Sequence, residues 1–81
     1  MTLKEAKARK ALTRQDLREI DSEFLIPVIV AKVLHCDPYA INVQAHADAS
    51  KLGYKVSIQG RRVRIPRLAF IQYMEGEDEN H

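Results

Sequence analysis

The chain has 81 residues, enough for one domain with a modest core and too few for an enzyme with a deep cleft and a second domain. Hydrophobic residues make up 46% of it and charged residues 30%, as in an ordinary soluble globular protein. The net charge of +2 is unevenly distributed. Without the four acidic residues of positions 75–79, the rest carries 13 basic and 7 acidic residues, a net charge of +6.

The cysteine content and the hydropathy pattern bear on location. A single cysteine, Cys36, excludes an intramolecular disulfide and fits a reducing cytoplasm. The longest apolar run, residues 24–31, contains a proline and is far shorter than the ~20 residues of a membrane span, and the amino terminus has no signal-peptide core. These features predict a cytoplasmic protein with no membrane partner.

The first twenty residues divide into a basic arm and a short helix. Residues 1–12 are basic and alanine-rich, which predicts either a frayed helix or a disordered arm. Such an arm could touch backbone phosphate, or it could be a solvated tail. Thr13 is suited to cap a helix from about residue 14 to residue 20, with Asp16 placed favourably near its positive end. Its apolar face would consist of Leu12, Leu17 and Ile20.

A helix is predicted to begin at Pro27, because proline lacks an N–H that would be unpaired in a first turn. The preceding residues 24–26 are apolar and are predicted to be extended and buried. After Pro27, apolar side chains recur at helical spacing and stop at His35. They are Val30, Ala31, Val33 and Leu34.

A second helix is predicted after a break of about three residues. Asp37 can accept hydrogen bonds from its free amides, and Pro38 pre-sets its first turn. Ile41, Ala45 and Asp48 follow at helical spacing. Two short helices joined by so short a turn are typical of the helix-turn-helix, in which the second helix enters the major groove of DNA.

The next segment is predicted to form a β-hairpin. Residues 56–58 and 63–65 alternate apolar and polar side chains, so each run has one apolar face. Gln59-Gly60 reverses the chain, with its glycine at positive φ. If the apolar side chains of the second run face the core, Arg62 and Arg64 face solvent.

Two further glycines mark the ends of the neighbouring segments. Gly53 closes a connection over residues 49–53 in a left-handed turn. A last helix is predicted to begin at Pro66 and to end at Gly76, before an acidic tail at residues 77–81. Its apolar surface would comprise Leu68, Ala69, Phe70, Ile71, Tyr73 and Met74.

Three groups of residues carry a resemblance to a known family, and they lie between Phe24 and Gly76. They are Ala31-Lys32-Val33-Leu34, Asp37 with Ile41, and above all Gly60-Arg61-Arg62-Val63-Arg64-Ile65-Pro66-Arg67 followed by LAFIQYM. On these residues the chain resembles the small winged helix-turn-helix domain of phage and transposon excisionases, which is related to the DNA-binding domain of mercury-resistance-type regulators. It departs from the family at His35, where the family has a turn glycine, and over residues 44–53.

The expected fold is therefore mainly α-helical with a small β-hairpin. The resemblance implies a winged helix-turn-helix of three to four helices and a two-stranded wing, over residues 13–76. The second helix, with Ile41 and Ala45 inward, would present its opposite face to DNA. The candidate contacts on that face are Tyr39, Asn42, Val43 and His46.

Three of these four side chains have a particular role or an alternative. Asn42 suits direct reading of an adenine edge through two hydrogen bonds. Tyr39 could instead pack against the hairpin, and His46 could be an ordinary exposed histidine at a helix end. Gln44 could face either the groove or the core side.

The basic residues of the hairpin are the second group of candidates. Between Lys51 and Arg67 there are six basic residues and no acidic residue. Arg61, Arg62 and Arg64 are expected to contact phosphates or the minor groove, and Arg67 to reach the same strand. Any of these arginines could instead pair with an acid such as Asp48.

These features predict sequence-specific binding of double-stranded DNA. The resemblance implies an excisionase-like factor or a transcription regulator of a phage or conjugative transposon, with a site-specific recombinase as a candidate partner. Because a lone domain of this size reads few base pairs, a homo-oligomer on DNA is expected if the sites are specific. The alternative is a protein-interaction module, such as a phage packaging small subunit or a host-takeover factor. The turn around Cys36 lacks a nucleophile motif and a zinc spacing, so no catalytic residue, metal or cofactor is expected.

Overall fold

The computed structural model describes the backbone of residues 1–79 and the side chains of residues 1–76. The protein is mainly helical with a small antiparallel sheet, so the predicted class is confirmed, and the sheet has three strands where two were expected. The elements in chain order are α1 (Leu3–Ala8), α2 (Arg14–Arg18), β1 (Phe24–Leu25), α3 (Pro27–Leu34), α4 (Pro38–Asp48), the 3-10 helix η1 (Ala49–Leu52), β2 (Ser57–Gln59), β3 (Arg62–Pro66) and α5 (Arg67–Glu79).

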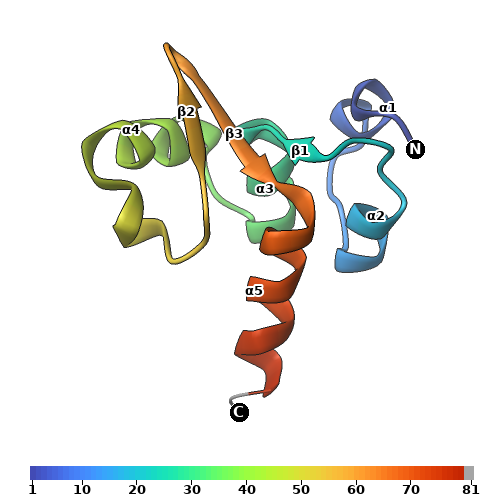
Figure 1. The fold of residues 1–81 in the computed structure, drawn as a ribbon. Helices are drawn as coiled ribbons and strands as arrows, with labels where there is room; N and C mark the ends of the chain where they lie inside the picture. Colours follow the sequence, from blue (N-terminus) through green and yellow to red (C-terminus); the bar gives the residue numbers. More distant parts are fainter. Residues whose placement is uncertain (80–81) are drawn as a thin grey trace.

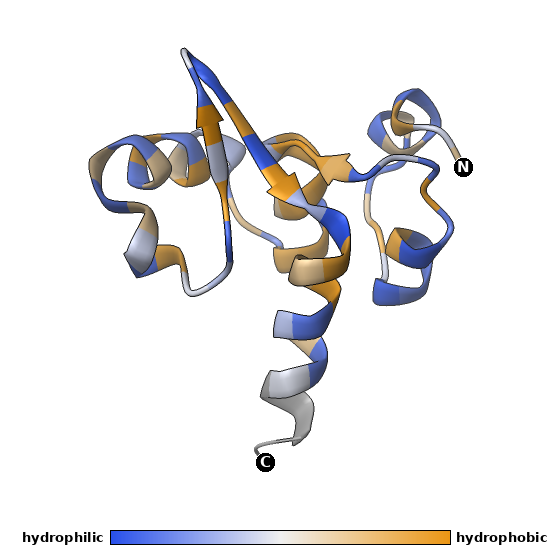
Figure 2. Cartoon of the chain, in the orientation of Figure 1, coloured by the Kyte–Doolittle hydropathy of each residue, from blue (hydrophilic) through white to orange (hydrophobic). Residues whose placement is uncertain are grey.

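The spatial arrangement places the β2–β3 hairpin between two groups of helices. In Figure 1, α4 lies on one side of the hairpin, and α1 and α2 lie on the other side, beyond β1. α5 runs away from the hairpin tip. Figure 2 shows hydrophilic residues at the tip and hydrophobic residues along β1 and the start of α3.

The segment expected as a frayed or disordered basic arm is folded in this structure. Thr2 and Glu5 form a capping box at the start of α1, which satisfies amides at the helix end. Ala6 and Leu12 are buried in the core. The backbone is also fixed, since the amide of Asp21 donates to the carbonyl of Met1 at 2.7 Å. Few apolar residues are enough to hold this segment on the domain because Ala6 and Leu12 both face the same core.

The predicted capping of α2 by Thr13 is confirmed. The Asp16 amide donates to Oγ1 of Thr13 at 3.2 Å, and the Thr13 amide donates to the Asp16 carboxylate at 2.8 Å. That backbone hydrogen bond is the main reason that the pKa of Asp16 is lowered from its ordinary value of 3.8. The helix ends at Arg18, while the predicted apolar residues Leu12, Leu17 and Ile20 are all buried.

The two central helices follow the predicted pattern. α3 begins at Pro27 and ends at Leu34, and His35 adopts the left-handed conformation at φ 59° and ψ 47°. Asp37 caps α4, its carboxylate accepting a hydrogen bond from the Tyr39 amide at 2.9 Å. Three residues therefore separate the helices, as in a helix-turn-helix.

The sheet has the strand order β1-β3-β2, with both pairings antiparallel. Residues 24–25, expected as an extended lead-in, form β1, and Leu25 pairs with Ile65. Because Gln59 pairs with Arg62, the two turn residues are Gly60 and Arg61, one position later than predicted. The predicted positive φ of Gly60 is confirmed at 62°.

The last helix packs through an aromatic cluster. Phe70 is fully buried, and its ring centroid lies 5.0 Å from that of Tyr54 in an edge-to-face arrangement. Burial raises the pKa of Tyr54 to about 12. Leu68, expected on the apolar face, is 65% exposed because it lies on the opposite side of α5. The helix continues through Gly76 to Glu79, beyond its predicted end, and residues 80–81 of the expected acidic tail lie outside the described residues.

Candidate nucleic-acid interface

A hollow of about 360 Å³ lies between α4, the start of α3 and the β2–β3 hairpin. We call it the arginine hollow. Its lining side chains include three arginines and one asparagine, and no carboxylate is among the lining residues that the structure describes. The lining residues are Ile26, Pro27, Asn42, Arg61, Arg62, Val63 and Arg64.

Strand and helix geometry bring these side chains together. Val63 is buried, so its neighbours Arg62 and Arg64 project from the other face of β3. Asn42 follows the buried Ile41 by one position on α4 and is only partly covered. Four of the eight candidate DNA contacts from the sequence, Asn42 and three hairpin arginines, thus share one concave site.

The three arginines of the hollow differ in their freedom. Arg61 and Arg62 are exposed at and next to the hairpin turn. Arg64 is partly buried, and its guanidinium carbon lies 5.9 Å from the centroid of the Phe24 ring, within cation–π range. Arg64 therefore contacts β1, while the side chains of Arg61 and Arg62 are exposed to solvent.

Arg67 occupies a different environment from the other candidate arginines. Its Nε donates to the carbonyl of Ser22 at 2.8 Å, and its Nη1 donates to the carbonyl of Leu17 at 3.3 Å. It does not line the arginine hollow, whose described lining ends at Arg64. These bonds tie α5 to α2 and to the segment that follows it, and contact between Arg67 and DNA stays a prediction.

The other three candidates lie on the open surface of α4, outside the arginine hollow. Tyr39 is 73% exposed, Val43 is 48% exposed, and His46 is also exposed. Their spacing of four and three residues places them on one helix face. Gln44, left open from the sequence, donates from Nε2 to the carbonyl of Asp48 at 3.0 Å and so stabilises the end of α4.

Sequence reasoning did not single out several residues near this site, although it left open a phosphate contact by the amino-terminal arm that contains Lys10. Ile26 and Pro27 form one wall of the arginine hollow because β1 pairs with β3 and brings the start of α3 against the hairpin. Lys10 and Lys32 line a second pocket beside the first turn of α3. Lys32 alone gave a local signal, as a charge within the apolar helix VIVAKVL.

Comparisons with family models, with curated proteins and with solved structures found no match to this chain. The excisionase resemblance therefore rests on the motif residues alone. Among the helices that the structure describes, none is long and apolar enough to cross a membrane.

Proposed function

We propose that this protein binds double-stranded DNA as a winged helix-turn-helix. In this proposal α3 and α4 form the helix-turn-helix, α4 enters the major groove, and the β2–β3 hairpin is the wing. The three-residue separation of the two helices and the position of the hairpin beside α4 support it. The 13 basic residues of the chain, six of them between positions 51 and 67, support an anionic partner.

The observation that carries the proposal is the shared lining of the arginine hollow. Asn42 offers the paired donor and acceptor that match an adenine edge. Arg61 and Arg62 offer forked donors that suit phosphates or a narrow minor groove. One concave site thus combines a group for base reading with groups for backbone contact, which are the two parts of specific DNA recognition.

The biological role follows from the resemblance over Gly60–Arg67 and the last helix. We propose an excisionase-like factor or a transcription regulator of a phage or conjugative transposon, acting in the cytoplasm. A site-specific recombinase would be the partner in the first role. A single small domain contacts few base pairs, so specific binding requires a homo-oligomer on repeated sites.

A salt titration with a mixed-sequence duplex tests DNA binding. The Arg61→Ala/Arg62→Ala variant removes two exposed charges of the hollow and leaves the core untouched. Loss of two phosphate contacts should lower the slope of log affinity against log salt by about 1.8. The control, Lys4→Ala/Lys7→Ala, removes the same charge from the exposed side of α1 and should lower it far less. Equal effects of the two variants would contradict the proposed site.

The exposed apolar surface of α4 favours one alternative. Tyr39 and Val43 are large and exposed, and α4 carries neither arginine nor lysine. A helix of this kind can dock a protein partner instead of a groove. A protein-interaction module would leave duplex DNA unbound even at low salt, so the same titration separates the two functions.

A further inference from the structure

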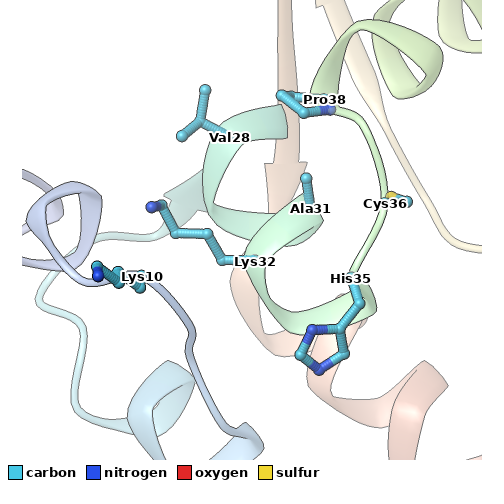
Figure 3. Close-up of a pocket in the computed structure, with 7 residues that line it drawn as sticks. All are labelled: Lys10, Val28, Ala31, Lys32, His35, Cys36 and Pro38. Atoms are coloured by element: carbon cyan, nitrogen blue, oxygen red, sulfur yellow. The ribbon is translucent and has the colours of Figure 1, made fainter.

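A second pocket, of about 290 Å³, lies along α3 from its first turn to its C-cap and is separate from the arginine hollow. We call it the lysine pocket. Val28 lines it, whereas the preceding Pro27 lines the arginine hollow. Three separate segments contribute: the linker after α1, helix α3 with its C-cap, and the start of α4 (Figure 3). The lining residues are Lys10, Val28, Ala31, Lys32, His35, Cys36 and Pro38.

The folding of the amino-terminal segment builds this pocket. Lys32 extends from α3 toward the linker (Figure 3), and its Nζ donates to the carbonyl of Arg9. This contact holds Lys10, the next residue, beside Lys32. A lysine ammonium has three donors, so Lys32 keeps two for another acceptor.

The charge in the lysine pocket is not offset locally. Arg9 is paired with Asp16 at 3.2 Å, which neutralises the linker's other cation, but no described acid pairs with Lys10. No carboxylate occurs in the described lining. The nearest acid in sequence, Asp37, uses its carboxylate to cap α4 at the Tyr39 amide. Lys10 and Lys32 therefore bring two ammonium groups to one pocket whose described lining holds no carboxylate.

We propose that the lysine pocket binds a phosphodiester group of the DNA backbone. In this proposal Lys10 and Lys32 contact a phosphate beside α3 and the start of α4. Backbone contacts from the hairpin and from the amino-terminal segment would then help to fix the register of the helix in the groove. The inference rests on the proposed function, and it gives the amino-terminal segment a role in DNA binding beyond the helix-turn-helix and wing.

The test uses the full chain and a mixed-sequence duplex. Lys10→Gln removes one exposed cation without touching the core, and Lys7→Gln is the matched control on the same segment. Loss of one phosphate contact lowers the salt slope by about 0.9 and the affinity about eightfold at 0.1 M salt. Lys7→Gln should leave both unchanged. Lys32→Gln should match Lys10→Gln, after its thermal unfolding shows that the fold is intact.

The outcomes separate this inference from the proposed function. If the Arg61→Ala/Arg62→Ala variant binds weakly while Lys10→Gln binds as tightly as Lys7→Gln, the inference is overturned and DNA binding stands. If the wild-type protein fails to bind the duplex, both fail.

A second arm identifies the source of the phosphate. Single methylphosphonate substitutions along the duplex neutralise one phosphate at a time. At one position the substitution should weaken the wild type and leave Lys10→Gln unaffected, because the same contact is already lost. Inorganic phosphate added to the DNA-saturated protein should cause no saturable NMR shift of the His35 amide. Saturable binding there would identify a small-anion site and contradict the proposal.

Discussion

The guanidinium Nε of Arg67 donates a hydrogen bond to the carbonyl of Ser22 at 2.8 Å, joining α5 to a residue 45 positions earlier. Its Nη1 also donates to Leu17. Hydrogen bonds from a charged donor are worth about 1.5–3 kcal/mol, so Arg67→Ala should lower the free energy of unfolding by about that amount. Urea unfolding measures the change. Arg61→Ala, which removes an exposed arginine, is the control and should change stability by less than about 0.5 kcal/mol.

The amino-terminal segment should be part of the cooperative fold. Leu12 is 4% exposed and packs in the core, so Leu12→Ala should cost about 2–5 kcal/mol of stability. Leu68→Ala deletes the same atoms from a side chain that is 65% exposed and should cost less than about 0.5 kcal/mol. A Leu12→Ala protein as stable as Leu68→Ala would show that residues 1–12 do not contribute to the core.

His35 occupies a backbone conformation that favours glycine. At φ 59° its Cβ crowds the following carbonyl, so His35→Gly should raise the unfolding free energy by about 0.5–1 kcal/mol, net of the greater freedom of the unfolded chain. Gly53→Ala should instead lower the free energy of unfolding. There φ is 84°, and an added Cβ would lie 3.2 Å from Cε1 of Tyr73. Thermal unfolding of both variants measures the two stability changes. A less stable His35→Gly variant would contradict the left-handed conformation of His35.

Tyr54 should make stability fall at high pH. Its folded-state pKa, about 12, lies above the ordinary value of 10.0, so the unfolded chain loses the proton first as pH rises. The stabilisation is complete below pH 10, falls by about 1.4 kcal/mol by pH 11, and is lost as pH passes about 12. Urea unfolding at about pH 9 and pH 11 measures this loss. Tyr54→Phe cannot ionise and should lose less stability, while an equal loss would assign the effect to other groups.

The elements governed by local patterns were predictable from the sequence. Proline at the first turn of α3, Asp37 before Pro38, and the alternation around Val63 each fix a local conformation, and the structure has each of them. The inward positions Ile41 and Ala45 followed from helical spacing alone. The same spacing gave the outward face of α4.

Features that depend on contacts distant in sequence were not predictable. The third strand exists because residues 24–25 meet residues 65–66, and no local pattern records that pairing. α1 has little apolar surface, and it is held by Ala6 in the core and by the contact between Lys32 and the Arg9 carbonyl. Arg67 looks like its neighbouring arginines in sequence, and only the fold brings it to the carbonyl of Ser22.

The most direct test of the proposed interface is an amide NMR titration of the labelled protein with a short duplex at low salt. DNA binding through α4 and the arginine hollow predicts the largest shifts at Tyr39, Asn42 and residues 60–64, and small shifts at Leu68 and Phe70 of α5. Absence of saturable shifts, or shifts centred on Leu68, would contradict the account. Binding confined to Tyr39 and Val43 of α4, with the hairpin amides unmoved, would contradict the assignment of the hairpin as a wing.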